Sequence, residues 1–99
     1  MIMAESKSHK AAANRLADLY GAEYNQGKGA DINTPGVVIE VETPETVSDG
    51  LRQLQGHQKP VYVAGTNKEA VEKALEKTKG TTVGVMDNQG NIVKSSTRR

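Results

Sequence analysis

Residues 37–42 read Val-Val-Ile-Glu-Val-Glu, and this run constrains the fold more than any other segment of the chain. β-Branched residues favour strands, and apolar and acidic side chains alternate along the run with a period of two. Directly afterwards, Thr43 suits a helix N-cap, Pro44 the first helical position and Glu45 the first helical turn. The segment therefore predicts a strand that leads into a helix, as in a strand–helix–strand unit.

The rest of the chain shows the same mixture of helical and strand patterns. Ser6 or Ser8 can cap a first helix that ends at Gly21, and Asn67 and Gly80 bound the last helix. Strands are predicted at 22–25, from 31, at 37–42, 60–64, 82–86 and 91–94, with a loose tail at 95–99. The resulting order, α-β-β-β-α-β-α-β-β, predicts an α/β fold with a mixed sheet flanked by helices.

The composition is that of one globular domain, which we expect to span residues 1–99. Hydrophobic residues make up 35% and charged residues 25% of the chain, and both Phe and Trp are absent. The absence of Cys excludes disulfides, zinc–thiolate sites and cysteine nucleophiles. The longest apolar run covers only Val61 to Ala64, so we expect no membrane span and a cytoplasmic location.

Acidic residues are concentrated in the middle of the chain, although the formal net charge is only +1. Residues 31–50 contain five acids and no base, whereas residues 51–99 contain nine bases and four acids. Glu40 and Glu42 share one face of their predicted strand, about 7 Å apart along it. A hairpin turning at residues 34–36 would bring Asp31 alongside Glu40. Three carboxylates are therefore expected at one edge of the sheet.

Clustered carboxylates repel one another unless something neutralises them. Mg²⁺ or Mn²⁺ would do so, because such cations take carboxylate oxygens together with water and substrate phosphate. A metal held there can polarise a phosphodiester and lower the pKa of a bound water. The alternative interpretation is a half-exposed strand whose polar face meets solvent.

Asp31-Ile32 follows a glycine-rich loop and precedes Val38-Ile39-Glu40-Val41-Glu42-Thr43, and this pattern resembles the active-site core of the PD-(D/E)xK nuclease superfamily. Archaeal Holliday junction resolvases are nearest in layout, over roughly residues 4–78. The resemblance implies a restriction-endonuclease-like fold and a metal-dependent endonuclease acting on branched or duplex DNA. It also implies a homodimer, since junction cleavage needs two sites on one substrate.

The resemblance also assigns roles to individual positions. It makes Asp31 and Glu40 the metal-binding carboxylates. Glu5 resembles the acidic residue of the family's first helix, and Gln53 resembles a helix glutamine that supports the site in some members.

The departure from the family pattern is Glu42, which stands where the motif has lysine. Glu42 is then expected to be a third metal ligand or a base, with Lys28 or Lys59 as possible sources of the missing ammonium. The alternative is a catalytically inactive nucleic-acid-binding or protein-interaction module on the same fold.

Basic residues outside the acidic segment are expected to hold DNA phosphates. The candidates are Lys7, Lys10, Lys28, Arg52 and Lys59. The two histidines, His9 and His57, have no partner at ligand spacing and are interpreted as surface residues.

Overall fold

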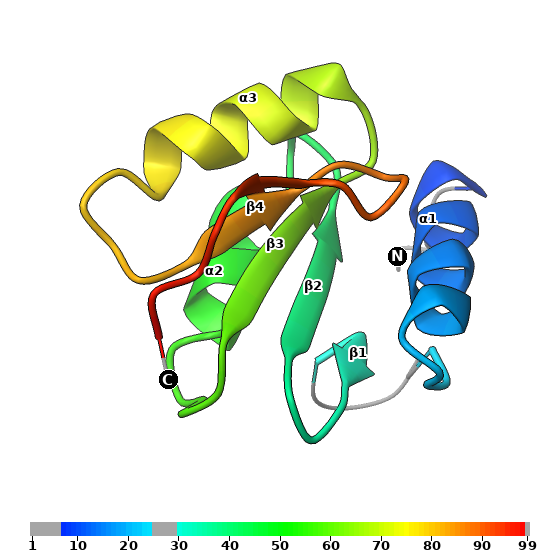
Figure 1. The fold of residues 1–99 in the computed structure, drawn as a ribbon. Coiled ribbons are helices and arrows are strands. Elements are labelled where there is room, and N and C mark those ends of the chain that lie inside the picture. The colour runs from blue at the N-terminus through cyan, green and yellow to red at the C-terminus, as the bar shows by residue number, and fades with distance from the viewer. Residues whose placement is uncertain (1–6, 25–29, 99) are drawn as a thin grey trace.

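The computed structural model describes residues 7–24 and 30–98, and the described part forms one mixed sheet with helices on both faces (Figure 1). The predicted α/β fold is confirmed, with one strand fewer than expected. In chain order the elements are α1 (Lys7–Leu19), β1 (Ile32–Asn33), β2 (Val38–Glu42), α2 (Val47–Gln53), β3 (Val61–Gly65), α3 (Lys68–Lys77), β4 (Gly84–Met86) and β5 (Ile92–Lys94).

The five strands lie in the sheet in their sequence order, β1-β2-β3-β4-β5. β2, β3 and β4 are parallel and are connected through α2 and α3, while β1 and β5 pair antiparallel at the two edges. Glu40 on β2 lies opposite Val63 on β3, and Glu42 lies opposite Gly65. All five residues of β2 are buried, as expected for a strand with neighbours on both sides and helices above and below.

The two faces of the sheet bury separate apolar clusters. Ile39 and Val41 face the cluster that includes Leu16 of α1, whereas Val38 and Val63 face the cluster under α2 and α3. The predicted alternation of side chains along residues 37–42 is therefore confirmed. The interpretation of its acidic face as a half-exposed surface is wrong, because two helices cover that face.

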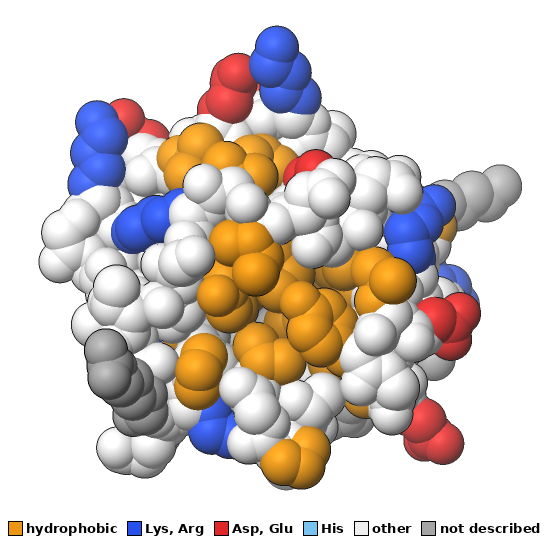
Figure 2. Space-filling model, in the orientation of Figure 1, with side chains coloured by type: hydrophobic (Ala, Val, Ile, Leu, Met, Phe, Trp, Pro, Cys, Tyr) orange, Lys and Arg blue, Asp and Glu red, His pale blue; other side chains and the backbone are white. Residues whose placement is uncertain are grey.

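Of the described helices, only α1 packs on the other face of the sheet (Figure 1). Figure 2 shows apolar side chains gathered at the centre of the face that Figure 1 presents, where β2 and β3 run. The edge strand β5 adds Ile92 and Val93, both about half exposed. Single exposed apolar residues at a sheet edge are common, and Lys94 completes this short strand.

The strand predicted at 22–25 is not formed by residues 22–24, and Asn25 lies outside the described residues. Instead, these residues close the end of α1. Gly21 has a φ of 63°, the Ala22 N–H donates to Ala17 O, and the Gly21 N–H donates to Asp18 O. This left-handed turn satisfies the last carbonyls of the helix and directs the chain back along it.

The second helix begins later than predicted, at Val47 rather than at Pro44. The Thr46 side-chain oxygen accepts from the Thr43 N–H at 2.9 Å, and the Thr46 N–H donates to Thr43 O at 3.0 Å. These bonds close a turn over residues 44–46, so Thr46 rather than Thr43 becomes the N-cap residue.

The tail at residues 95–98 is not loose, contrary to the prediction. The Ser96 hydroxyl donates to Thr82 O, and the Arg98 guanidinium donates to Leu54 O and His57 O. These carbonyls belong to the end of α2 and the segment after it, so the tail fastens that helix to the start of β4. Side-chain hydrogen bonds of this kind cannot be read from the composition of a terminal segment.

Candidate metal centre

Three carboxylates meet where β1 and β2 pair. Asp31, Glu40 and Glu42 each offer one oxygen, and these oxygens lie within 4.8 Å of one another. The hairpin between the strands sets Ile32 opposite Ile39, which places Asp31 beside Glu40 as predicted. The side chains of this triad could together hold a metal ion.

Asp31 is fixed by the backbone of the neighbouring strand. Its Oδ2 accepts a hydrogen bond from the Val41 N–H at 2.8 Å. β1 contains only two residues and is too short to offer a backbone carbonyl to this N–H. The Asp31 carboxylate accepts the hydrogen bond in its place. The Asp31 side chain therefore keeps a defined orientation on a rigid part of the sheet.

Glu42 is held against the backbone of α2. A Cβ added to Gly50 would lie 2.6 Å from both Cγ and Cδ of Glu42, so only glycine leaves room for this side chain. Thr46 lies beside the Glu42 carboxyl group and lowers its pKa. Glycine inside a helix costs about 1 kcal/mol relative to alanine, and here the close approach of Glu42 explains its presence.

Glu40 is the most buried member of the triad and the least satisfied. The residue is 3% exposed, and its Oε2 has no hydrogen-bond partner in the described part of the chain. Burial, followed by the charges of Asp31 and Glu42, raises the pKa of Glu40 to about 9. Burial also raises the pKa of Glu42 to about 7, against the lowering effect of Thr46. A divalent cation can replace protons held in such a site.

His9 lies beside Asp31 of the triad, although the sequence pattern predicted a surface position for it. Its Nε2 lies 3.5 Å from Asp31 Oδ2, its Nδ1 lies 3.2 Å from the Tyr24 hydroxyl, and its side chain is only 15% exposed. The helical period contains a signal for this placement. His9 precedes Ala12 by three residues and Ala13 by four, so it shares their buried face of α1.

The structure does not bring Lys59 to the triad. Its ammonium donates to Asn33 Oδ1 at 2.6 Å and to Thr34 O at 2.7 Å, which braces the β1–β2 hairpin. Val63 of β3 lies opposite Glu40, and Lys59 comes four residues before Val63, which is about 13 Å along the strand. Lys59 therefore acts on the turn rather than on the carboxylates.

The remaining predicted residues are dispersed. Gln53 is exposed at the last position of α2, and Arg52 forms an exposed ion pair with Asp49. Lys10 is exposed on α1 beside His9. Lys7 begins α1, and its side chain is not described; Glu5 and Lys28 lie outside the described residues.

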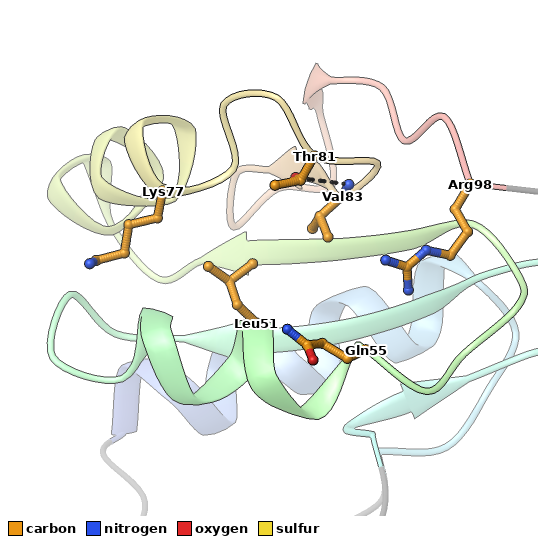
Figure 3. Close-up of a pocket in the computed structure, with 6 residues that line it drawn as sticks. All are labelled: Leu51, Gln55, Lys77, Thr81, Val83 and Arg98. Atoms are coloured by element: carbon orange, nitrogen blue, oxygen red, sulfur yellow. Dashed lines mark hydrogen bonds between the residues drawn. The ribbon is translucent and has the colours of Figure 1, made fainter.

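A pocket of about 420 Å³ opens between α2 and α3, away from the triad. It is lined by Leu51, Gln55, Lys77, Thr81, Val83 and Arg98. Figure 3 shows Leu51 and Val83 lying between the cationic side chains of Lys77 and Arg98. The pocket is therefore basic at its rim, whereas the triad is acidic.

No known protein family, curated protein or solved structure matches this chain. Within residues 7–24 and 30–98, none of the helices has the length and apolar character needed to cross a membrane. Metal binding is therefore inferred from the chemistry of the triad itself, and the substrate from the sequence resemblance.

Proposed function

We propose that the protein is a metal-dependent phosphodiester hydrolase acting on DNA, with Asp31, Glu40 and Glu42 holding the metal. The observation that carries the proposal is a buried, unpartnered carboxylate oxygen, Oε2 of Glu40, inside a cluster of three carboxyl groups. A buried polar atom without a partner is costly, and a bound cation would remove that cost.

The donor set fits a hard divalent cation. The triad offers carboxylate oxygens, which are the ligands that Mg²⁺ and Mn²⁺ prefer. Two of the carboxylates come from one strand and the third from its hairpin partner, so the sheet keeps their spacing without help from a flexible loop. We therefore assign Mg²⁺ or Mn²⁺ as the cofactor.

The approach of a substrate is limited to one side of the site. Glu40 and Glu42 are 3% and 5% exposed, whereas the Asp31 side chain is 14% exposed. A phosphate would therefore approach past Asp31, the most exposed of the three carboxylates. A bound Mg²⁺ or Mn²⁺ supplies positive charge that polarises a phosphodiester and makes a water more acidic. The hydrogen bond that the Val41 N–H donates to Asp31 Oδ2 fixes the orientation of this carboxylate on the open side of the site.

A protein that binds nucleic acid without cutting it is the second candidate. Two features favour it: Glu42 stands where the nuclease motif that the sequence resembles has lysine, and α2 packs against its carboxyl group. A buried acid in that position can stabilise a metal without activating a water. The two functions differ in one outcome, which is cleavage.

The test is incubation of the full chain with labelled branched, duplex and single-stranded DNA in the presence of Mg²⁺ or Mn²⁺. We expect metal-dependent cleavage that is lost in Asp31→Ala and retained in Asp49→Ala, a matched control at an exposed aspartate. Binding without cleavage would support the second candidate. Neither binding nor cleavage would overturn the nucleic-acid role.

Glu42→Lys recreates the family motif and separates a working site from a decayed one. In a working three-carboxylate site, this change removes a ligand and adds a repulsive charge, so metal affinity and cleavage should both fall. In a decayed site, the same change should create cleavage that the parent protein lacks. Glu42→Ala, assayed beside it, separates the loss of the acid from the gain of the ammonium.

A further inference from the structure

We propose that His9 is a nitrogen ligand of the same metal site, so that the site selects Mn²⁺ or another transition-metal cation over Mg²⁺. The inference rests on the proposed metal binding by the triad and adds the identity of a fourth ligand. Three features of His9 carry it: the position of Nε2, the contact of Nδ1 and the rigidity of the helix beneath the ring.

The first feature is distance. His9 Nε2 lies 3.5 Å from Asp31 Oδ2. Two ligand atoms bound to one cation at about 2.1 Å are separated by about 3 Å in adjacent positions and about 4 Å in opposite positions. The observed separation lies within this range, so one cation can bind these two atoms. His9 is not among the residues whose ligand atoms all lie within 4.8 Å of one another, so its ring must turn towards Glu40 and Glu42 to bind the cation held by the triad.

The second feature is the partner of the other ring nitrogen. His9 Nδ1 lies 3.2 Å from the Tyr24 hydroxyl, and the two rings are tilted at 54°. Metal-binding histidines usually direct their second nitrogen to an outer partner that fixes the ring and its tautomer. When the Tyr24 oxygen accepts from Nδ1–H, the lone pair of Nε2 is directed at Asp31.

The third feature is the support under the ring. His9 lies one helical turn before Ala12 and Ala13, which are 2% and 0% exposed in the core beneath α1. The Cα of His9 is therefore fixed by a packed helix face, and its side chain is 15% exposed. A rigid backbone and a fixed tautomer are the conditions that a metal ligand needs.

A nitrogen ligand changes which metal the site prefers. Mg²⁺ takes oxygen ligands and retains several waters, whereas imidazole suits transition-metal cations such as Mn²⁺, Fe²⁺ and Zn²⁺. Three carboxylates alone would accept Mg²⁺ and Mn²⁺ similarly. The addition of His9 should therefore favour Mn²⁺ over Mg²⁺.

The deciding experiment is pulsed electron paramagnetic resonance on the full chain loaded with one equivalent of Mn²⁺. We expect a coupling from a directly bound ¹⁴N nucleus in the parent protein, its loss in His9→Gln and its persistence in His57→Gln. Mn²⁺ bound without any nitrogen coupling in the parent protein would overturn the role of His9 while leaving the triad intact. Failure of the parent protein to bind Mn²⁺ would overturn both proposals.

Affinities measured by titration calorimetry supply a second readout. His9→Gln should weaken Mn²⁺ binding at least tenfold and change Mg²⁺ binding by less than about threefold. Tyr24→Phe keeps the ring but removes the hydroxyl, so it should weaken Mn²⁺ binding by a smaller factor. Equal losses for both cations in His9→Gln would contradict the inference, and unfolding of each metal-free variant shows whether the fold is retained.

Discussion

Acidic side chains lie against the first half of α2 and a basic side chain lies against its end, and the two groups differ in their hydrogen bonds. Thr46 at the N-cap and Gly50 at the fourth position of the helix lie against Glu42, and the neighbouring Glu40 has a buried oxygen without a partner among the described residues. At the end of α2, Arg98 donates to Leu54 O, His57 O and Thr82 Oγ1. The Arg98 guanidinium thus finds hydrogen-bond acceptors within the protein, whereas Oε2 of Glu40 has no partner among the described residues.

The comparison extends to the sheet. The triad lies beside β2 towards its C-terminal end, and the basic pocket is lined by Val83, which precedes β4, and by the tail. One face of the sheet thus carries an acidic site and a basic pocket under the same pair of helices. Substitutions in the acidic triad should alter metal binding, and substitutions around the basic pocket should alter only the free energy of unfolding.

The largest expected effect is on the pH dependence of the metal-free protein. The pKa of Glu40 is raised to about 9 and that of Glu42 to about 7, so the folded chain binds more protons than the unfolded chain above pH 4.5. The free energy of unfolding should therefore fall as the pH rises from about 4.5 to about 9, by a few kcal/mol in order of magnitude. Denaturant titrations at a series of pH values measure it.

Glu40→Gln is the control for this pH effect, because it keeps the shape of the side chain and removes its titration. The fall in stability between pH 4.5 and 9 should become clearly smaller in this variant. A profile identical to that of the parent protein would show that Glu40 is not the group whose proton is lost.

Gly50→Ala should have the next largest effect. The new methyl group would lie 2.6 Å from Glu42 Cδ, so either the helix or the carboxyl group must move. Overpacking of this kind costs about 2 kcal/mol of unfolding free energy, and the displaced Glu42 should also weaken metal binding. Gly56→Ala is the matched control, because nothing lies within 4 Å of its added Cβ.

Arg98→Met should have a smaller effect, confined to stability. The change keeps much of the apolar stem but removes the bonds to Leu54 O and His57 O, at a cost of about 1 kcal/mol for this partly exposed group. Metal affinity should equal that of the parent protein. A loss of metal binding in Arg98→Met would show that the two ends of α2 are coupled, contrary to the comparison.

Local patterns were sufficient to predict much of the fold and the core of the site. The β-branched run at 37–42, the turn at 34–36 and the Asn67 cap all form as expected, and Asp31, Glu40 and Glu42 meet. Each of these features depends on residues close together in the sequence or on a single hairpin.

The features that sequence reasoning missed depend on contacts between distant elements. The burial of Glu42 requires α2 to lie over β2 with Gly50 at the contact, and the ordered tail requires Arg98 to reach the end of α2. His9 lies against Asp31 because α1 packs beside β1. Its helical spacing predicts a buried face but does not indicate which charged group that face will meet.

The most direct test of the metal site is the effect of Mn²⁺ on unfolding, measured for the parent protein, Glu40→Gln and the surface control Asp49→Asn. A cation at a hundredfold excess over its dissociation constant stabilises the only state that binds it by about 2.7 kcal/mol. We predict this gain in the parent protein and in Asp49→Asn, and a much smaller gain at the same Mn²⁺ concentration in Glu40→Gln. Equal gains in all three proteins, or none in the parent, would contradict a cation site at Asp31, Glu40 and Glu42.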